Sequence, residues 1–328
     1  ARGPQGEATP VLRYLTHRLL EAALVLLAMS LLIYLLLGLM PGDPIDLMAS
    51  GDPNMTSEDV ARLKAVYGLD RPLLERYGHW LAGAVSGDFG YSRLHARPVL
   101  EVLLPRLGNT CLLMGVSFVL ALIVALPAGV LAAMRPRSVL DYGLNLFAFA
   151  GISMPSFWLG LLLILLFSVQ LGWLPASGVT SVGGDTVAAR LIHLILPVLT
   201  LTMLTVGSVL RFTRSAMIET LRQDYVRTAY AKGLGPAGVV LRHALRNAMI
   251  PVATVIALHF GALFSGAMIV ETMFAYLGMG KLIYDSIIGN DFNVALVGLL
   301  FATLLTLLSN LGADVVYAWL DPRISYER

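Results

Sequence analysis

Long uninterrupted runs of apolar residues dominate the chain. A helix needs about 20 such residues to cross a hydrocarbon core about 30 Å thick. Five runs reach this length: Leu19 to Leu39, Cys111 to Met134, Leu191 to Leu210, Asn247 to Val270 and Phe292 to Ala313. Because each holds at most one charged or histidine side chain, the pattern predicts transmembrane helices.

A sixth apolar stretch, Tyr142 to Gly184, carries no charged residue. It is long enough for one span plus a loop, or for a hairpin of two short spans around Pro155. Cytoplasmic loops carry an excess of Lys and Arg. A single span puts the basic segment Arg211 to Arg246 on the same side as the basic link at 135–137, whereas a hairpin separates them. We therefore predict six spans with both termini in the cytoplasm, and a proline kink at Pro155.

The composition agrees with this membrane pattern. The chain is 57% hydrophobic and 13% charged, whereas soluble domains are about 25% charged. The net charge is +2, and no basic stripe with interleaved aromatics appears, so a nucleic-acid partner is not expected. Cys111 is the single cysteine, which excludes an intrachain disulfide and a thiolate metal cluster. The predicted fold class is an all-α polytopic membrane protein of six transmembrane helices.

The polar segments divide the chain into four parts. Residues 1–40 are the cytoplasmic N-terminus and the first transmembrane helix, which is too long for a signal peptide. Residues 41–107 are an external, periplasmic segment, in which Ser57 and the acidic residues after it predict a capped amphipathic helix. Residues 108–322 are expected to form a five-helix core with a cytoplasmic loop at 214–250, and residues 323–328 a cytoplasmic tail. The expected location is the bacterial inner membrane.

The polar stretch between the fourth and fifth spans carries helix start and stop signals. Asp224 is expected to cap a short helix, and Gly233 and Gly235 are expected to supply the positive φ that ends it. Pro236 fits the first turn of a second helix, which is expected to continue to Pro251 at the entrance of the fifth span. A helix, a glycine break and a second helix of this size often only connect two spans, so from the residues alone a docking function and a simple connection are both open.

This stretch resembles the loop by which permeases of ATP-binding-cassette (ABC) importers dock on their ATPases. Gly233 and Pro251 match the glycine and the proline of that loop, and Ala229 matches the second alanine of its Glu-Ala-Ala start. Arg227 and Thr228 replace the first two residues of that start. The form Tyr-Val-Arg-Thr-Ala-x-Ala-Lys-Gly-Leu is similar to the dipeptide/oligopeptide/nickel branch of the class.

Further short motifs resemble the same branch along almost the whole chain. They are Pro41-Gly42-Asp43-Pro44, Gly68-Leu69-Asp70-Arg71-Pro72, Gly87-Asp88-Phe89-Gly90, Ser153-Met154-Pro155-Ser156-Phe157-Trp158 and Asp321-Pro322-Arg323-Ile324. One departure is Leu277, where the family usually has a proline before Gly278, so the local turn there is uncertain.

The resemblance implies a fold, partners and site residues. The implied fold is the type I importer membrane domain with an extra N-terminal helix and an external segment. The implied partners are a second related permease, two cytoplasmic ABC ATPases that bind the ATP and Mg, and a periplasmic or lipid-anchored solute-binding protein. The chain itself would need no cofactor or metal. The residues implied in ATPase coupling are Tyr225, Arg227, Thr228, Ala229, Ala231, Lys232, Gly233 and Leu234.

The function predicted from the resemblance is to form half of the translocation path for peptides or peptide-like solutes. A nickel or other small-solute importer is the main alternative, with His259 as a candidate metal contact. The candidates for a pathway or structural role are Ser153, Pro155, His259 and Glu271. His259 and Glu271 are included because ionisable groups at membrane depth are costly.

Two other classes of protein fit the sequence less well. An ion-coupled secondary transporter should show internal repeats and a midplane site, and no convincing repeat is visible. A membrane enzyme should show a convergent set of acids, bases or metal ligands. No G-x-x-x-x-G-K-[ST] phosphate loop is present, so ATP hydrolysis is expected in a partner chain.

Overall fold

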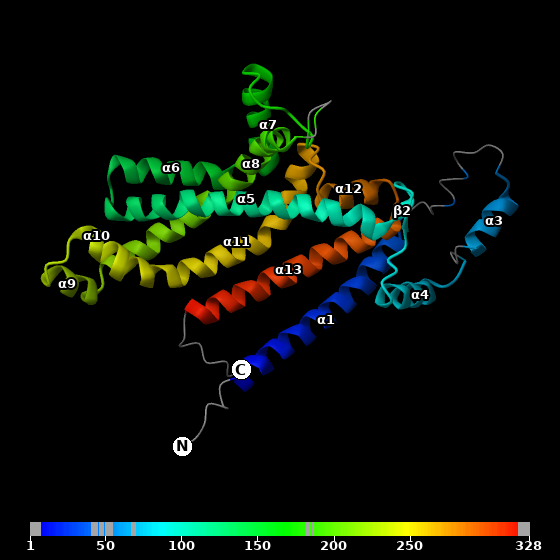
Figure 1. The fold of residues 1–328 in the computed structure, drawn as a ribbon, viewed down its shortest axis with the longest axis horizontal. Coiled ribbons are helices and arrows are strands. Elements are labelled where there is room, and N and C mark those ends of the chain that lie inside the picture. Colours follow the sequence, from blue (N-terminus) through cyan, green and yellow to red (C-terminus); the bar gives the residue numbers. More distant parts are fainter. Residues whose placement is uncertain are drawn as a thin grey trace. The chain divides into compact units, whose positions relative to one another are not determined.

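The computed structural model describes residues 8–40, 45, 49, 55–66, 70–180, 184 and 186–320. This part of the chain is helical apart from loops and one small two-stranded hairpin (Figure 1). The chain divides into two compact units. One comprises Ala1–Asn109 with Gly278–Leu305, and the other comprises Thr110–Leu277 with Thr306–Arg328. Three of the motifs that resemble the peptide branch fall wholly or partly outside the described residues: those at 41–44, 68–72 and 321–324.

Within the described residues, five helices are long and apolar enough to cross a membrane. They contain Thr16–Gly38, Val99–Met134, Val187–Leu221, Pro236–Phe260 and Phe292–Gly312. These ranges overlap the five predicted apolar runs. The run Asn247 to Val270, of which Pro236–Phe260 covers only the first part, lies within helix α11 (Leu245–Met273), so the five runs are confirmed as helices.

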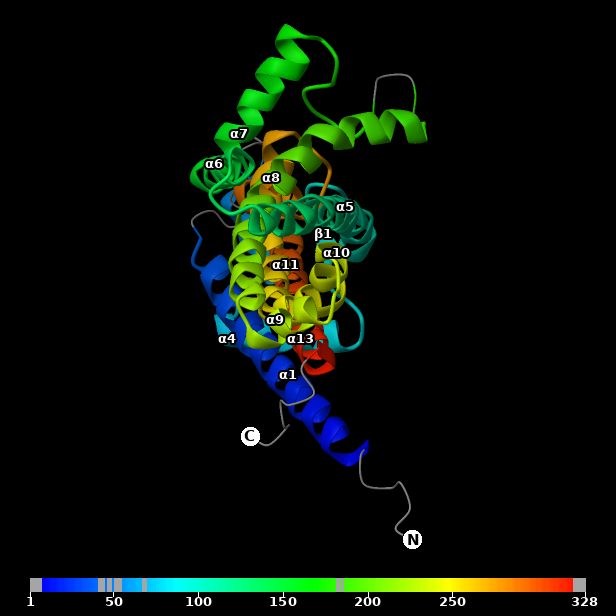
Figure 2. The same ribbon diagram turned by 90° about the vertical axis from the view of Figure 1, so that its left-hand side faces the viewer.

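The sixth apolar stretch is a pair of helices with a sharp bend. Helix α6 (Val139–Ser153) is followed by α7 (Ser156–Leu163), which continues as a π-helical segment, η1 (Ile164–Gln170). The two halves are bent by 108°, and in Figure 2 α7 leaves the direction of α6 steeply. The sequence predicted the position of the bend correctly, but it predicted a kink within one helix and not a break between two helices. Pro155 does not kink a continuous helix; it caps a new one, and Met154 before it is extended, as a residue preceding proline prefers.

The first unit is built around helix α1 (Ala8–Gly38). It packs on α4 (Leu73–Val85) through an aromatic cluster in which Tyr34 lies with its ring centroid 5.0 Å from Phe292, 5.5 Å from Tyr77 and 6.1 Å from Trp80. Ser30 and Tyr77 share a hydrogen bond of 2.8 Å beside this cluster. Aromatic packing of this kind fixes the first span to the polar segment that follows it.

A small hairpin in the same unit is held by a buried carboxylate. Strand β1 (Tyr91–Ser92) pairs antiparallel with β2 (Arg97–Pro98). Asp291 lies between α12 (Met279–Ile288) and α13 (Phe292–Leu320), and it accepts hydrogen bonds from Ser92 Oγ at 2.5 Å and from Leu94 N at 3.1 Å. The hairpin is thereby fixed to the turn before α13.

Helix α3 (Ser57–Val66) has a cap different from the predicted one. Thr56, not Ser57, is the capping residue. Its Oγ1 accepts from Asp59 N at 3.2 Å, and Asp59 Oδ2 accepts from Thr56 N at 3.0 Å. The Thr56 hydroxyl, which donates to Asp59 Oδ2 at 2.6 Å, and then the Thr56 N–H lower the pKa of Asp59. The reciprocal pair is a capping box shifted by one residue from the expected position.

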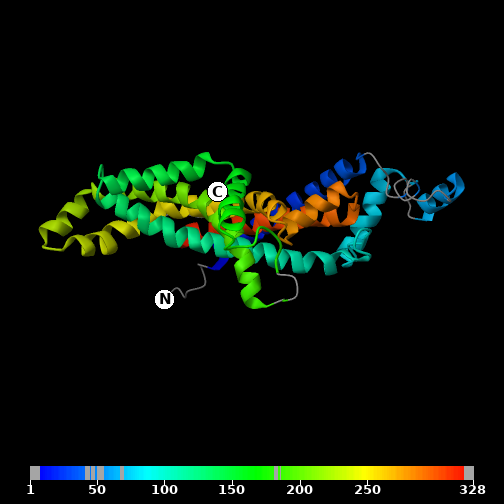
Figure 3. The ribbon, with the colours of Figure 1, turned by 90° about the horizontal axis from the view of Figure 1, so that it is seen from above.

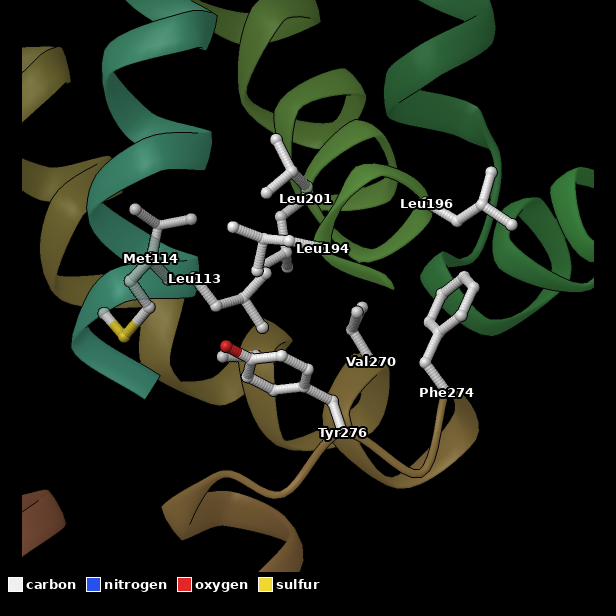
Figure 4. Packing of buried hydrophobic residues seen from close by; sticks show 11 residues of the cluster. Leu113, Met114, Leu194, Leu196, Leu201, Val270, Phe274 and Tyr276 are labelled. Carbon is white, nitrogen blue, oxygen red and sulfur yellow. The ribbon is translucent and has the colours of Figure 1, made fainter. Parts of the chain in front are cut away.

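The second unit is a bundle of α5 (Val99–Met134), α6, α8 (Val187–Leu221) and α11 (Leu245–Met273). Its largest core cluster, seen in Figure 4, gathers side chains from α5, α8 and the end of α11, among them Leu113, Met114, Leu194, Leu196, Leu201, Val270, Phe274 and Tyr276. Two glycines allow α6 and α8 to approach closely. A Cβ at Gly207 would lie 2.5 Å from the carbonyl oxygen of Ala148, and one at Gly151 would lie 2.9 Å from that of Met203.

Candidate docking helix

The candidate site is helix α9 (Asp224–Ala231), called the docking helix below. Helix α8 ends at Leu221, and only Arg222 and Gln223 separate it from α9. The sequence had suggested Asp224 as the cap, but Asp224 is the first helical residue. Gln223 holds the cap position and makes no side-chain cap hydrogen bond. An acidic side chain in the first turn still stabilises the positive end of the helix dipole.

The end of the docking helix depends on one glycine. Gly233 has φ +82°, and its N–H donates to Tyr230 O at 2.9 Å, while Leu234 N–H donates to Ala229 O at 3.4 Å. This pair of bonds is the Schellman arrangement, which needs a left-handed residue at the position of Gly233. The predicted positive φ at Gly233 is confirmed. The one predicted at Gly235 is wrong, since φ there is −66°.

The chain then returns without a break into the next span. Pro236 occupies the first position of α10 (Pro236–Gly238), as predicted, and a π-helical segment, η2 (Val239–Ala244), joins α10 to α11. Pro251 lies inside α11 and does not separate a second short helix from the span. The predicted coupling loop is therefore mostly helical, and Arg214, which was assigned to it, lies in α8. Figure 3 shows α9 and α10 at one end of the α5, α6, α8 and α11 bundle.

The inner face of the docking helix is apolar and buried. Val226 and Ala229 pack against Val239 of η2 and Leu221 of α8. Ala229 is only 5% exposed, and its side chain lies on the inner face of the helix. Below this layer a second cluster joins α5, α8, η2 and α11, with Ala133, Met217, Val240, Ala244 and Ala248 buried in it. The docking helix thus stands on a packed helical base.

The outer face combines aromatic, apolar and basic side chains. Its exposed residues are Tyr225, Arg227, Thr228, Tyr230, Ala231, Lys232 and Leu234, and the exposed Asp224 carboxylate lies 3.5 Å from the Arg227 guanidinium. Tyr225 is oriented by Asn247 of α11, whose Nδ2 donates to the phenolic oxygen at 2.8 Å, a contact that sequence reasoning did not find. Large apolar side chains gathered on an exposed polar segment are typical of a protein-binding surface.

The four pathway or structural candidates are not brought together as one site. Ser153 and Pro155 lie exposed at the bend between α6 and α7. His259 and Glu271 are both in α11 but twelve residues apart, which is about 18 Å along a helix. Among the described residues, no group of three or more His, Cys, Asp or Glu side chains is arranged to hold a metal ion.

Glu271, near the end of α11, lies in the protein interior. It is fully buried, and its Oε1 accepts a hydrogen bond of 2.5 Å from Thr110 Oγ1 of α5. Its backbone oxygen accepts from Tyr276 N at 2.8 Å in the turn that precedes Leu277. Burial, followed by the nearby Glu271 carboxylate, raises the pKa of Tyr276 to about 12. Glu271 therefore ties α5 to α11.

A buried ion pair was also missed. Asp141 of α6 and Arg214 of α8 form two short hydrogen bonds. In the sequence Asp141 stands just before the apolar stretch that begins at Tyr142, and Arg214 is one of several basic residues in the segment Arg211 to Arg246. Nothing local connects two residues that are 73 positions apart.

Comparison of the sequence with known protein families identifies the family to which this chain belongs. The family model described as binding-protein-dependent transport system inner membrane component matches residues 125–326, and the model of its N-terminal region matches residues 11–114. The chain belongs to this family. It is accordingly a multi-pass membrane permease of an ABC importer and not an enzyme, and the resemblance noted in the sequence is confirmed.

Curated relatives match along the whole length. The oligopeptide transport system permease protein AppB of Bacillus subtilis is 40% identical over 315 residues, covering 95% of this chain and 99% of AppB. The glutathione transport system permease protein GsiC of Escherichia coli is 40% identical over 317 residues, covering 97% of this chain and all of GsiC.

Solved structures confirm the fold class. An inward-facing MetNI methionine ABC transporter matches with a TM-score of 0.54 and 19% identity, over 68% of this chain and 97% of the other. A chain of an amino acid ABC transporter matches with a TM-score of 0.51 and 14% identity, over 67% and 94%. The predicted type I importer membrane domain is therefore the fold of this permease.

Proposed function

We propose that this permease forms half of the translocation path of an importer for peptides or peptide-like solutes. The observation that carries the proposal is the 40% identity, over nearly the whole of both chains, to relatives named for oligopeptide and glutathione transport. Glutathione is itself a peptide-like molecule, so the two names agree on a class of solute.

The docking helix is the proposed contact with a cytoplasmic ABC ATPase. Its buried inner face joins it to α8 and η2, and its outer face presents Tyr230 and Leu234 together with Arg227 and Lys232. Aromatic and apolar anchors with a basic rim suit a cleft on a partner protein. The complete importer would contain a second related permease, two ATPases and a periplasmic or lipid-anchored solute-binding protein.

Orientation follows from the same assignment. The docking helix lies in the cytoplasm, where ATP is available, and the basic residues of this region agree with the excess of Lys and Arg in cytoplasmic loops. With six spans, both termini are then cytoplasmic, and the segment that contains α3, α4 and the β1–β2 hairpin is periplasmic.

Uptake by the assembled importer tests the solute class. Proteoliposomes containing this permease, its partner permease and the two ATPases are given the binding protein and, in parallel, labelled dipeptides, a labelled oligopeptide, glutathione and nickel. We expect ATP-dependent accumulation of at least one peptide. Nickel uptake that is lost in a His259→Ala variant, with no peptide-stimulated ATPase activity, would overturn the peptide assignment.

A further inference from the structure

The Asp141 carboxylate, at the start of α6, accepts hydrogen bonds from three residues. It is 2% exposed, and Arg214 of α8 donates to it twice, from Nε to Oδ1 at 2.5 Å and from Nη2 to Oδ2 at 2.7 Å. Such a bidentate pair fixes orientation as well as distance, because the planar guanidinium fits both carboxylate oxygens at once.

The same carboxylate also orders the link that leads into α6. Arg137 N donates to Oδ2 at 2.9 Å, Asn145 Nδ2 donates to Oδ1 at 2.7 Å, and the hydroxyl of Ser138 caps the helix by accepting from Asp141 N at 3.2 Å. Asp141 therefore joins three elements: the link after α5, the first turns of α6, and α8. A buried charge satisfied in this way is costly to disturb, since removal of one partner leaves the other charge uncompensated.

Further along, the same two helices are in backbone contact. Gly207 of α8 faces the carbonyl oxygen of Ala148, and Gly151 of α6 faces that of Met203, at separations that leave little room for a side chain. The Arg211 guanidinium also lies 4.4 Å from the centre of the Phe149 ring. Helices α6 and α8 are thus bound to each other from the ion pair to the last turn of α6.

Helices α6 and α8 connect to different elements at their C-terminal ends. Helix α8 continues, through Arg222 and Gln223, into the docking helix. Helix α6 ends at the 108° bend with α7. Helix α7 also packs on α8 and α11, so α6 is one of the routes by which a displacement of the docking helix can reach the bend, and this route requires that α6 follows α8.

We propose that Asp141 and Arg214 form a clamp that makes α6 move with α8, so that displacement of the docking helix is passed to the bend between α6 and α7. The two residues are positioning residues and do not contact the ATPase. This inference rests on the proposed coupling function of α9. It adds a route by which the motion enters the membrane part of the permease.

Neutral and charge-preserving variants test the clamp in the reconstituted importer. We expect Asp141→Asn and Arg214→Lys to retain the ATPases in a pull-down and to retain ATP hydrolysis. The amount of solute transported per ATP hydrolysed should fall about tenfold, a factor that corresponds to an ordinary coupling free energy between two sites. The matched control is Glu75→Gln, which removes the exposed Arg71–Glu75 pair of 3.1 Å and should leave transport per ATP unchanged. Unchanged transport per ATP in both clamp variants would overturn the proposal.

A covalent substitute separates the clamp from a role in folding alone. Asp141→Cys and Arg214→Cys are combined in a Cys111→Ser background and joined by a short bifunctional thiol reagent. The clamp predicts poor coupling before cross-linking and recovery after it. Failure to recover contradicts it, as does a fall in transport on cross-linking. ATPase binding separates the two proposals. A docking-helix variant should lose ATPase binding, whereas the clamp variants should retain it, so either proposal can fail without the other.

Discussion

At the scale of single residues, Gly233 shows how much local sequence can specify. A glycine between two short helices predicted a left-handed residue, and φ at Gly233 is +82°. Gly235 looked equivalent in the sequence but has φ −66°, because the chain has already turned and Pro236 begins the next helix. Local signals gave the place of the turn, whereas the hydrogen bonds from Gly233 and Leu234 back to the helix decided which glycine makes it.

These two glycines provide a matched pair of variants. Neither has an atom within 4 Å of where a Cβ would be placed, so a Cβ at either position meets no neighbour. Gly233→Trp should still assemble in the membrane, at a backbone strain of about 1–2 kcal/mol, yet uncouple ATP hydrolysis from transport, because a large side chain is added beside the docking face. Gly235→Ala should transport normally. Normal transport by a well-expressed Gly233→Trp permease would contradict the docking role of α9.

Asp141 and Arg214 mark the limit of residue-level prediction. Charged residues that flank apolar runs are typical of the ends of transmembrane helices. On that basis the sequence placed Arg214 in the cytoplasmic loop at 214–250. The structure continues α8 beyond it to Leu221 and pairs it with Asp141. Only the packing of α6 on α8, which no periodicity records, could reveal the pair.

At the scale of elements, hydropathy was sufficient where a helix is straight and insufficient where it is not. The five long spans follow from the apolar runs alone. The α6–α7 pair does not, since the same composition allows a kinked span, a broken span or a hairpin. Helix α6 also packs closely on α8 at Gly151 and Gly207, and the significance of these glycines depends on which helix lies opposite.

Close packing of α6 on α8 gives a stability prediction. Gly207→Leu should destabilise the folded permease by about 1–3 kcal/mol, the usual cost of overpacking, because its Cβ would lie 2.5 Å from a backbone oxygen. Gly143→Ala in α6, the helix that packs against Gly207, places a Cβ with nothing within 4 Å and should be neutral or slightly stabilising. Thermal unfolding of the purified permease in detergent measures both. Equal melting temperatures for the two variants would mean that the contact of α6 with α8 is looser than described.

At the scale of the whole molecule, the sequence predicted class and fold because both rest on features spread along the chain. Hydropathy gave the number of long spans, and short motifs in order gave the family. The solute-binding surface could not be predicted in this way, and Ser153, Pro155, His259 and Glu271 are not gathered into one site.

Membrane orientation is the first whole-molecule prediction. In a Cys111→Ser background, a cysteine at Lys232 should be labelled by an impermeant thiol reagent only after the membrane is opened, since α9 is proposed to be cytoplasmic. A cysteine at Val85, which is 83% exposed at the end of α4, should be labelled in intact spheroplasts. The reverse pattern would exclude the six-span arrangement with cytoplasmic termini.

The most direct test of the central claim is photo-cross-linking from the outer face of the docking helix in assembled importer complexes. A photoreactive phenylalanine analogue is placed at Tyr230, which is 45% exposed on α9, and as a control at Tyr284, which is 46% exposed on α12. The account predicts a cross-link to the ATPase from position 230 and none from position 284. A cross-link to the ATPase from 284, or none from 230 in a complex that hydrolyses ATP, would contradict it.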